Sequence, residues 1–171
     1  LLENSLDAGA THLIIELRSG GTELIRVVDN GCGIPANETS LLFQRHATSK
    51  LWTAEELHSI SSLGFRGEAL YAIAAVSSVS LLTRVASEAS GIKIEIQLGE
   101  PPSRAPHGAP VGTSVSVENL FRKVPARLNF LRSARAEATR VQSVVTAYAQ
   151  AYPEVHFSLE IDGSTVFTAP G

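Results

Sequence analysis

The amino-acid sequence predicts an α+β fold, in which helices cover one face of a mostly antiparallel sheet. Three observations predict this class. Helix-like and strand-like segments are not evenly interleaved, which argues against a doubly wound parallel sheet. Several strand-like segments alternate apolar and polar residues, as in a sheet with one face in water. Glycine-bearing turns at 19–21 and 162–163 join consecutive strand-like segments as hairpins.

The first half of the chain begins with the pattern of the last turns of a helix. Residues 1–8 carry this pattern, and Gly9 is the expected C-cap. The alternation then predicts two strands before a mainly polar region. The further elements expected here are strands at 12–18 and 22–29, a short helix at 38–43, a loop at 44–53, one helical turn at 54–57 and an Ala-rich helix at 68–76.

The second half is richer in strands and contains the longest predicted helix. Residues 99–110 carry four of the eight prolines and are predicted to form a surface loop. Pro153 ends the long helix. The elements expected here are strands at 79–85, 92–98 and 111–117, a basic and apolar turn with a short helix at 121–131, the helix at 134–152 and a hairpin of 155–161 with 164–168.

Composition limits the class of protein. A chain of 171 residues fits one domain, and 44% hydrophobic with 18% charged residues is typical of a globular protein. The net charge of -3 argues against a dedicated nucleic-acid binder. The single cysteine, Cys32, cannot form an internal disulfide, which suits a reducing cytoplasm. The sequence shows no run of membrane-spanning length and no signal peptide.

Asp29 ends a strand-like stretch, and alternation places it on the same face as Ile25 and Val27. A carboxylate at the buried end of a strand requires hydrogen-bond donors. Gly31 and Gly33 follow, and glycines let the chain turn and let a ligand approach the backbone. The amino group of a heterocycle such as adenine would suit this acceptor. The alternative is an Asn-Gly turn that Asp29 caps.

A second glycine-bearing stretch, Gly64 to Leu70, leads directly into the Ala-rich helix. Glycines before a helix free the backbone to lie close to an anion, and the helix N-terminus presents unpaired N–H groups. Arg66 adds a positive charge nearby. The alternative is a glycine-broken loop before a core helix, because Gly-x-x-Gly is a weak signal and no P-loop motif is present.

Two of three further polar positions, Thr113 and Asn4, have two interpretations each. Thr113 shares a strand face with Val115 and Val117, so it either fills the core or lends its hydroxyl to a base or a water. Asn4 could offer its carbonyl oxygen to Mg2+, or it is a polar residue near a helix end. Lys50, in the polar loop, is expected to be solvated by default.

Six of the fourteen Lys and Arg residues cluster late in the chain. Such a cluster is by default a solvated face, although it could contact phosphates weakly and in a salt-dependent way. The five histidines and the cysteine show no metal-ligand spacing. The clustered residues are Arg122, Lys123, Arg127, Arg132, Arg135 and Arg140.

Five segments together resemble the MutL family of DNA mismatch repair ATPases, within the GHKL superfamily of type II topoisomerases, heat-shock chaperones and sensor kinases. Their order and spacing fit from residue 1 to about 131. The third and fourth segments are the most specific to MutL-like proteins. The segments are Glu-Asn-Ser-Leu-Asp-Ala-Gly-Ala-Thr at 3–11, Asp-Asn-Gly-Cys-Gly-Ile at 29–34, Arg-His-Ala-Thr-Ser-Lys at 45–50, Gly-Phe-Arg-Gly-Glu-Ala-Leu at 64–70, and Pro-Ala-Arg with Phe-Leu at 125–131.

The resemblance implies the Bergerat ATP-binding fold, a two-layer sandwich of a mixed, mostly antiparallel sheet with helices on one face. It implies that Asn4 holds Mg2+, that Asp29 accepts a hydrogen bond from the adenine amino group, and that Thr113 supports the adenine, partly through water. The remaining implied ATP contacts are Gly31 and Gly33, the ATP-ordered loop residues Thr48, Ser49 and Lys50, and the phosphate-cradling lid residues Gly64, Phe65, Arg66, Gly67, Glu68, Ala69 and Leu70.

For the complete protein, the resemblance implies an ATP-driven dimerisation switch that closes two N-terminal domains and reopens on hydrolysis. The implied partners are a second copy, a MutS-like mismatch-recognition protein, a downstream nuclease or helicase and, weakly, DNA, in a bacterial cytoplasm and without a membrane. One alternative is another GHKL machine, such as a topoisomerase subunit or a kinase. Another is a non-hydrolysing interaction module.

The sequence departs from the family pattern at the catalytic position. The family's general base is a glutamate one helical turn before the Mg2+ asparagine, and that position precedes Leu1. Glu3 adjoins Asn4 and points to another side of the helix. The second, transducer domain, whose lysine meets the γ-phosphate, and the C-terminal dimerisation domain are also missing. We therefore expect residues 1–171 to be an N-terminally truncated ATPase domain that does not hydrolyse ATP alone.

Overall fold

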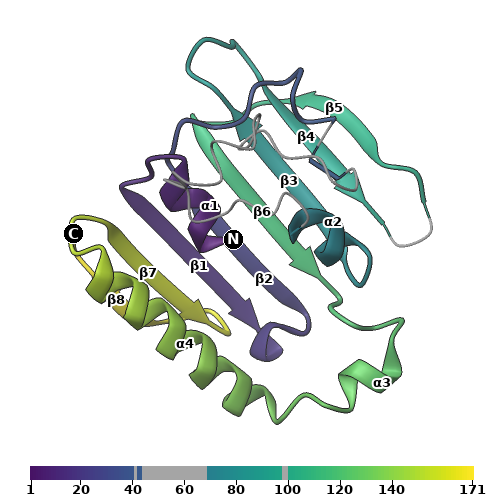
Figure 1. The fold of residues 1–171 in the computed structure, drawn as a ribbon, viewed down its shortest axis with the longest axis vertical. Coiled ribbons are helices and arrows are strands. Elements are labelled where there is room, and N and C mark those ends of the chain that lie inside the picture. Colours follow the sequence, from purple (N-terminus) through teal and green to yellow (C-terminus); the bar gives the residue numbers. More distant parts are fainter. Residues whose placement is uncertain (41, 44–68, 98–99) are drawn as a thin grey trace, which may run out of the picture.

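The computed structural model describes residues 1–40, 42–43, 69–97 and 100–171. Within these residues, eight strands form one sheet, shown in Figure 1. The strands are β1 His12–Arg18, β2 Leu24–Asp29, β3 Ser78–Arg84, β4 Gly91–Ile96, β5 Ser103–His107, β6 Gly112–Glu118, β7 His156–Ile161 and β8 Ser164–Ala169. Their order across the sheet is β5-β4-β3-β6-β2-β1-β7-β8. All neighbours pair antiparallel except β1 and β7, which are parallel, so the sheet is mixed.

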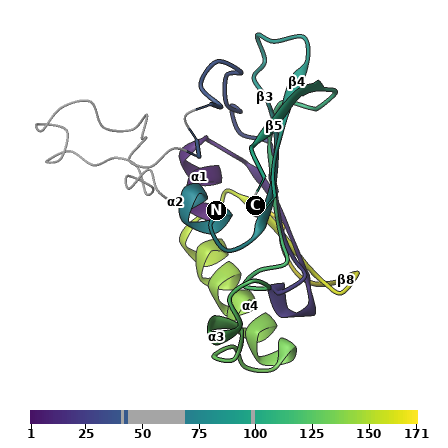
Figure 2. The same ribbon diagram turned by 90° about the vertical axis from the view of Figure 1, so that its right-hand side faces the viewer.

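The helices lie against a single face of this sheet. Figure 2 shows α1, α2 and α4 on the same side, with the other side bare. The bounds are α1 Leu2–Asp7, the 3-10 helix η1 Ser19–Gly21, α2 Ala69–Ala74, α3 Pro125–Leu128 and α4 Ala134–Ala151. The predicted α+β class, with a mostly antiparallel sheet and helices on one face, is therefore confirmed.

Two apolar clusters fill the space between the helices and the sheet. The first joins β1, β7 and α4 and includes Leu13, Phe157 and Val145. The second joins β3, β6 and α2 and includes Leu81 and Leu70. Leu13, Ile15 and Leu17 are buried, as alternation from position 13 along β1 predicts. The clusters anchor the helices that flank the site described below.

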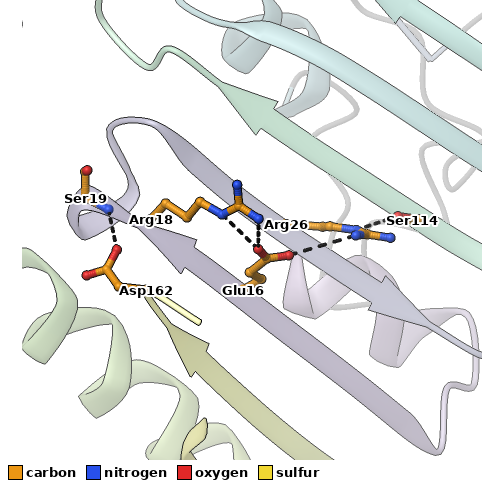
Figure 3. A network of polar contacts seen from close by, with 6 residues as sticks. All are labelled: Glu16, Arg18, Ser19, Arg26, Ser114 and Asp162. Carbon is orange, nitrogen blue, oxygen red and sulfur yellow. Dashed lines mark hydrogen bonds and ion pairs between the residues drawn. The ribbon is translucent and has the colours of Figure 1, made fainter. Parts of the chain in front are cut away.

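The opposite face of the sheet is polar, which confirms the predicted wet face. Figure 3 shows Glu16 on β1 between two arginines of the same face. Its carboxylate lies 2.8 Å from Arg18 and 3.9 Å from Arg26, whose Nε donates to Ser114 on β6 at 3.4 Å. The Arg18 and Arg26 side chains are 60% and 47% exposed, so solvent screens these pairs and they contribute little to stability. They mark the face that no helix covers.

The helix predicted at 38–43 is wrong for the described residues. Residues 36–40, 42 and 43 form turns in which Glu38 N–H donates to Pro35 and Leu42 N–H donates to Thr39, three residues back. The Thr39 hydroxyl donates to the Ala36 carbonyl at 2.7 Å. Such side-chain bonds offer the backbone an alternative to the helical pattern.

The loop predicted at 99–110 is also corrected, because 103–107 form β5. A loop was predicted because this segment is rich in proline, which disfavours strands in general. Proline is tolerated on edge strands, where its missing N–H leaves no ladder bond unmade. β5 is such an edge: it pairs only with β4 in the described sheet, and Pro106 faces Ile92 there.

Candidate functional site

One row of residues crosses the sheet and changes from polar to apolar. Thr83, Thr113 and Asp29 stand opposite one another on β3, β6 and β2. The row continues through Leu13 on β1 to Phe157 on β7. Because these positions share one face, the polar half of the row lies beside the apolar core. The predicted inward orientation of Asp29 follows from this register.

Asp29 is half-buried and is held by three donors. Its Oδ1 accepts the N–H groups of Gly31 at 3.0 Å and Thr113 at 3.2 Å. Its Oδ2 accepts the hydroxyl of Ser5 at 2.7 Å. A carboxylate oxygen has two lone-pair directions, so the donors of the described residues fill Oδ1 and leave one direction of Oδ2 open. The site can therefore accept a hydrogen from one further donor group.

Gly31 and Gly33 approach the protein's own backbone closely. A Cβ on Gly31 would lie 2.8 Å from the carbonyl oxygen of Ala8, at the end of α1. Gly33 has φ +75°, and a Cβ there would lie 2.1 Å from the carbonyl oxygen of Arg84 at the end of β3. Both glycines are thus required by packing of the loop after β2. Their expected contact with a nucleotide stays a prediction.

α1 presents Asn4 and Ser5 next to Asp29. Ser5 is 4% exposed and bonds Asp29, whereas Asn4 is exposed. The hydroxyl of Tyr148 on α4 donates to Glu3 at 3.0 Å, which ties α1 to the long helix. Partial burial and this hydrogen bond raise the pKa of Tyr148.

The exposed amide oxygen of Asn4 is suited to serve as a single protein ligand to Mg2+, because Mg2+ keeps several waters and usually also binds phosphates. No cluster of three His, Cys, Asp or Glu side chains suited to a metal occurs among the described residues.

Most of the second predicted half of the site lies outside the described residues. Ala69 and Leu70 are described and begin α2. Leu70 is 9% exposed and belongs to the second apolar cluster, whereas Ala69 is exposed. The predicted site residues outside the described ranges are Thr48, Ser49, Lys50, Gly64, Phe65, Arg66, Gly67 and Glu68.

Three residues of the site were not predicted from the sequence. Ser5 bonds Asp29, Thr83 bonds Thr113 at 3.0 Å, and Gly112 packs against the backbone of Asp29. Gly112 has φ +123°, and a Cβ there would lie 2.1 Å from the Asp29 carbonyl oxygen. A glycine directly before Thr113, at the start of β6, was the one signal available in the sequence. The other two roles depend on which elements pack together.

The basic cluster lies at the other end of β6 from Thr113. It follows the strand into α3 and the start of α4 (Figure 1). Several members already have partners: Arg127 lies 5.6 Å from the ring of Phe121, and Arg140 pairs with Glu137 at 3.1 Å. The Arg132 N–H also bonds Glu137 and, with Arg140, lowers the pKa of Glu137. The cluster takes no part in the row around Asp29.

The helices of the described residues carry no membrane span, since none combines the necessary length with apolar composition.

Comparisons with known proteins identify the family of the chain. The histidine kinase-, DNA gyrase B- and HSP90-like ATPase family matches residues 1–123. The DNA mismatch repair protein MutL of Desulforamulus reducens is 48% identical over the whole chain, which covers 27% of that protein. The MutL of Heliobacterium modesticaldum is also 48% identical, with 26% of its length covered. The chain thus spans about a quarter of these curated relatives.

A solved structure shows the same fold. The Aquifex aeolicus MutL ATPase domain complexed with ADP superposes with a TM-score of 0.77 at 34% identity, covering 99% of this chain and 60% of that one. No alternative within the superfamily is favoured over MutL. The chain therefore belongs to the histidine kinase-, DNA gyrase B- and HSP90-like ATPase family and, within it, matches the N-terminal ATPase domain of DNA mismatch repair protein MutL.

Proposed function

We propose that this chain binds ATP, with the amino group of adenine donating to Oδ2 of Asp29. The observation that carries the proposal is the lone pair of Oδ2 that no donor of the described residues fills, beside a loop of closely packed glycines. Adenine offers an N–H donor of the required kind. The ADP complex of the similar Aquifex domain supports the choice of an adenine nucleotide.

Asn4 is the proposed Mg2+ ligand, and the bound Mg2+ would supply positive charge to the phosphates. α1 holds this residue in place through the Ser5–Asp29 and Tyr148–Glu3 hydrogen bonds. The lid predicted at 64–70 and the loop residues Thr48, Ser49 and Lys50 would complete the phosphate site. These contacts come from the family resemblance and await a test.

The complete protein is proposed to act as an ATP-driven dimerisation switch in DNA mismatch repair. A nucleotide can drive such closure only if it binds the closed state more tightly than the open one. The proposed partners are a second copy, a mismatch-recognition protein, a downstream nuclease or helicase and, weakly, DNA, in a bacterial cytoplasm. The match to MutL proteins over the whole chain supports this role.

Ligand-observed NMR with ATP, with and without Mg2+, tests the binding proposal. We expect weak, Mg2+-dependent binding that loses its Mg2+ dependence in Asn4→Ala, because the metal then has no protein ligand. Asn129→Ala, which removes an exposed asparagine at the end of α3, is the matched control and should behave like the wild type.

The same 171-residue polypeptide is expected to show no ATP turnover, since it has no carboxylate one helical turn before Asn4. Phosphate release that disappears in Asn4→Ala would contradict this expectation. An ATP affinity that changes neither with Mg2+ nor in Asn4→Ala would contradict Asn4 as the Mg2+ ligand, but it would not contradict the proposed adenine contact.

A further inference from the structure

Thr83 is a buried threonine whose hydroxyl joins three parts of the site. It lies on β3 and is 1% exposed. Its Oγ1 lies 2.9 Å from the N–H of Ile34, in the loop that carries Gly33. It lies 3.1 Å from the carbonyl oxygen of Gly112 and 3.0 Å from Oγ1 of Thr113, both on β6. No other hydroxyl among the described residues makes this set of bonds.

The hydrogens at Thr83 can be assigned by counting donors. A hydroxyl has one hydrogen and two lone pairs. The Ile34 N–H fills one lone pair, and the hydrogen goes to the Gly112 carbonyl oxygen. The remaining lone pair faces Thr113, so the Thr113 hydroxyl must donate to Thr83. All three bonds of the buried hydroxyl are then satisfied.

The direction of this bond decides what Thr113 can offer a ligand. Because its single hydrogen is given to Thr83, its Oγ1 faces the site with lone pairs only. Its backbone N–H is also occupied, since it donates to Asp29. Asp29 likewise presents only an acceptor, at Oδ2. The two neighbouring groups of the row therefore both accept hydrogens.

We infer that Thr83 is a positioning residue that fixes Thr113 as an acceptor and thereby selects a 6-amino purine over a 6-oxo purine. The inference rests on the proposed function. An amino group supplies hydrogens to acceptors, whereas an oxo group opposite an acceptor leaves both unpaired, at a cost to affinity. A water that bridges Thr113 and the base would also favour the 6-amino purine. Such a water donates one hydrogen to Thr113 and can donate the other to ring N1. Ring N1 carries an accepting lone pair in adenine but a hydrogen in hypoxanthine, the 6-oxo base.

The test compares binding of ATP and inosine triphosphate to Thr83→Val by ligand-observed NMR. Valine keeps the shape but frees the Thr113 hydroxyl to rotate and donate. The wild-type preference for ATP should fall by about tenfold, the value of one hydrogen bond of about 1.4 kcal/mol. Thr83→Ser keeps the hydroxyl and should therefore keep the wild-type preference for ATP over inosine triphosphate. A merely structural role would weaken both nucleotides by the same factor.

Thr113→Val gives a second route if Thr83→Val does not fold. This variant removes the hydroxyl proposed to accept from the nucleotide or the water but leaves the bonds of Thr83 to Ile34 and Gly112. It should also lower the preference for ATP over inosine triphosphate. An unchanged ratio of the two affinities in the folded variant would overturn the inference. Failure of the wild type to bind either nucleotide would overturn the proposed function and the inference with it.

Discussion

Asp29→Asn should abolish detectable ATP binding while the chain still folds. The asparagine oxygen can keep accepting the N–H groups of Gly31 and Thr113, as Oδ1 of Asp29 does. Its amino group then replaces Oδ2, so a donor faces the adenine amino group. A hydrogen bond to a charged group contributes about 1.5–3 kcal/mol, so the expected loss of an already weak affinity is about 10- to 150-fold. Ligand-observed NMR measures the binding.

Asp162→Asn is the matched control for this variant. Asp162 accepts the N–H of Ser19 at 2.9 Å (Figure 3), in the turn between β7 and β8. This turn follows Ile161, at the opposite end of β1 and β7 from Leu13 and Phe157 of the row. It has φ +49°, a conformation that asparagine adopts readily. This control should bind ATP like the wild type. Retention of ATP affinity in Asp29→Asn within a factor of about 3 would remove the basis for placing adenine there.

Gly33→Ala should lower both the free energy of unfolding and ATP binding. The added Cβ would lie 2.1 Å from the Arg84 carbonyl oxygen, so the loop must move away from β3. This movement breaks the bond from the Ile34 N–H to Thr83, at a cost of about 1–3 kcal/mol. The positive φ adds about 1–2 kcal/mol of strain. Urea denaturation measures the loss of stability.

Gly163→Ala separates these two effects. Gly163 has φ +80°, close to that of Gly33, but a Cβ there meets nothing within 4 Å. Only the strain of about 1–2 kcal/mol should remain, and ATP binding should be unchanged. Equal losses of stability in Gly33→Ala and Gly163→Ala would contradict the prediction, because the close contact between the added Cβ and Arg84 would then have no cost in stability.

The elements that were predicted correctly have local causes. β1 follows from strict alternation at 12–18, and the last hairpin follows from alternation around Asp162 and Gly163, both with positive φ. The parallel pairing of β1 with β7 was not predicted, because it joins segments more than 140 residues apart. β5 was missed because prolines disfavour strands in general but are tolerated at this sheet edge.

The same distinction applies to the site. Asp29 could be predicted because a carboxylate at the inward end of a strand is informative by itself. Thr83 gives no such signal, since buried threonine is ordinary in strands. Its role depends on standing opposite Thr113 across β3 and β6, which is a matter of register. Ser5 depends likewise on where α1 packs.

The most direct measurement is a crystal structure of the chain with Mg2+ and a non-hydrolysable ATP analogue. We predict that the exocyclic amino nitrogen lies within about 3 Å of Oδ2 of Asp29, with the base beside Thr113. A base bound elsewhere, with Oδ2 of Asp29 contacting only Ser5 and solvent, would contradict it.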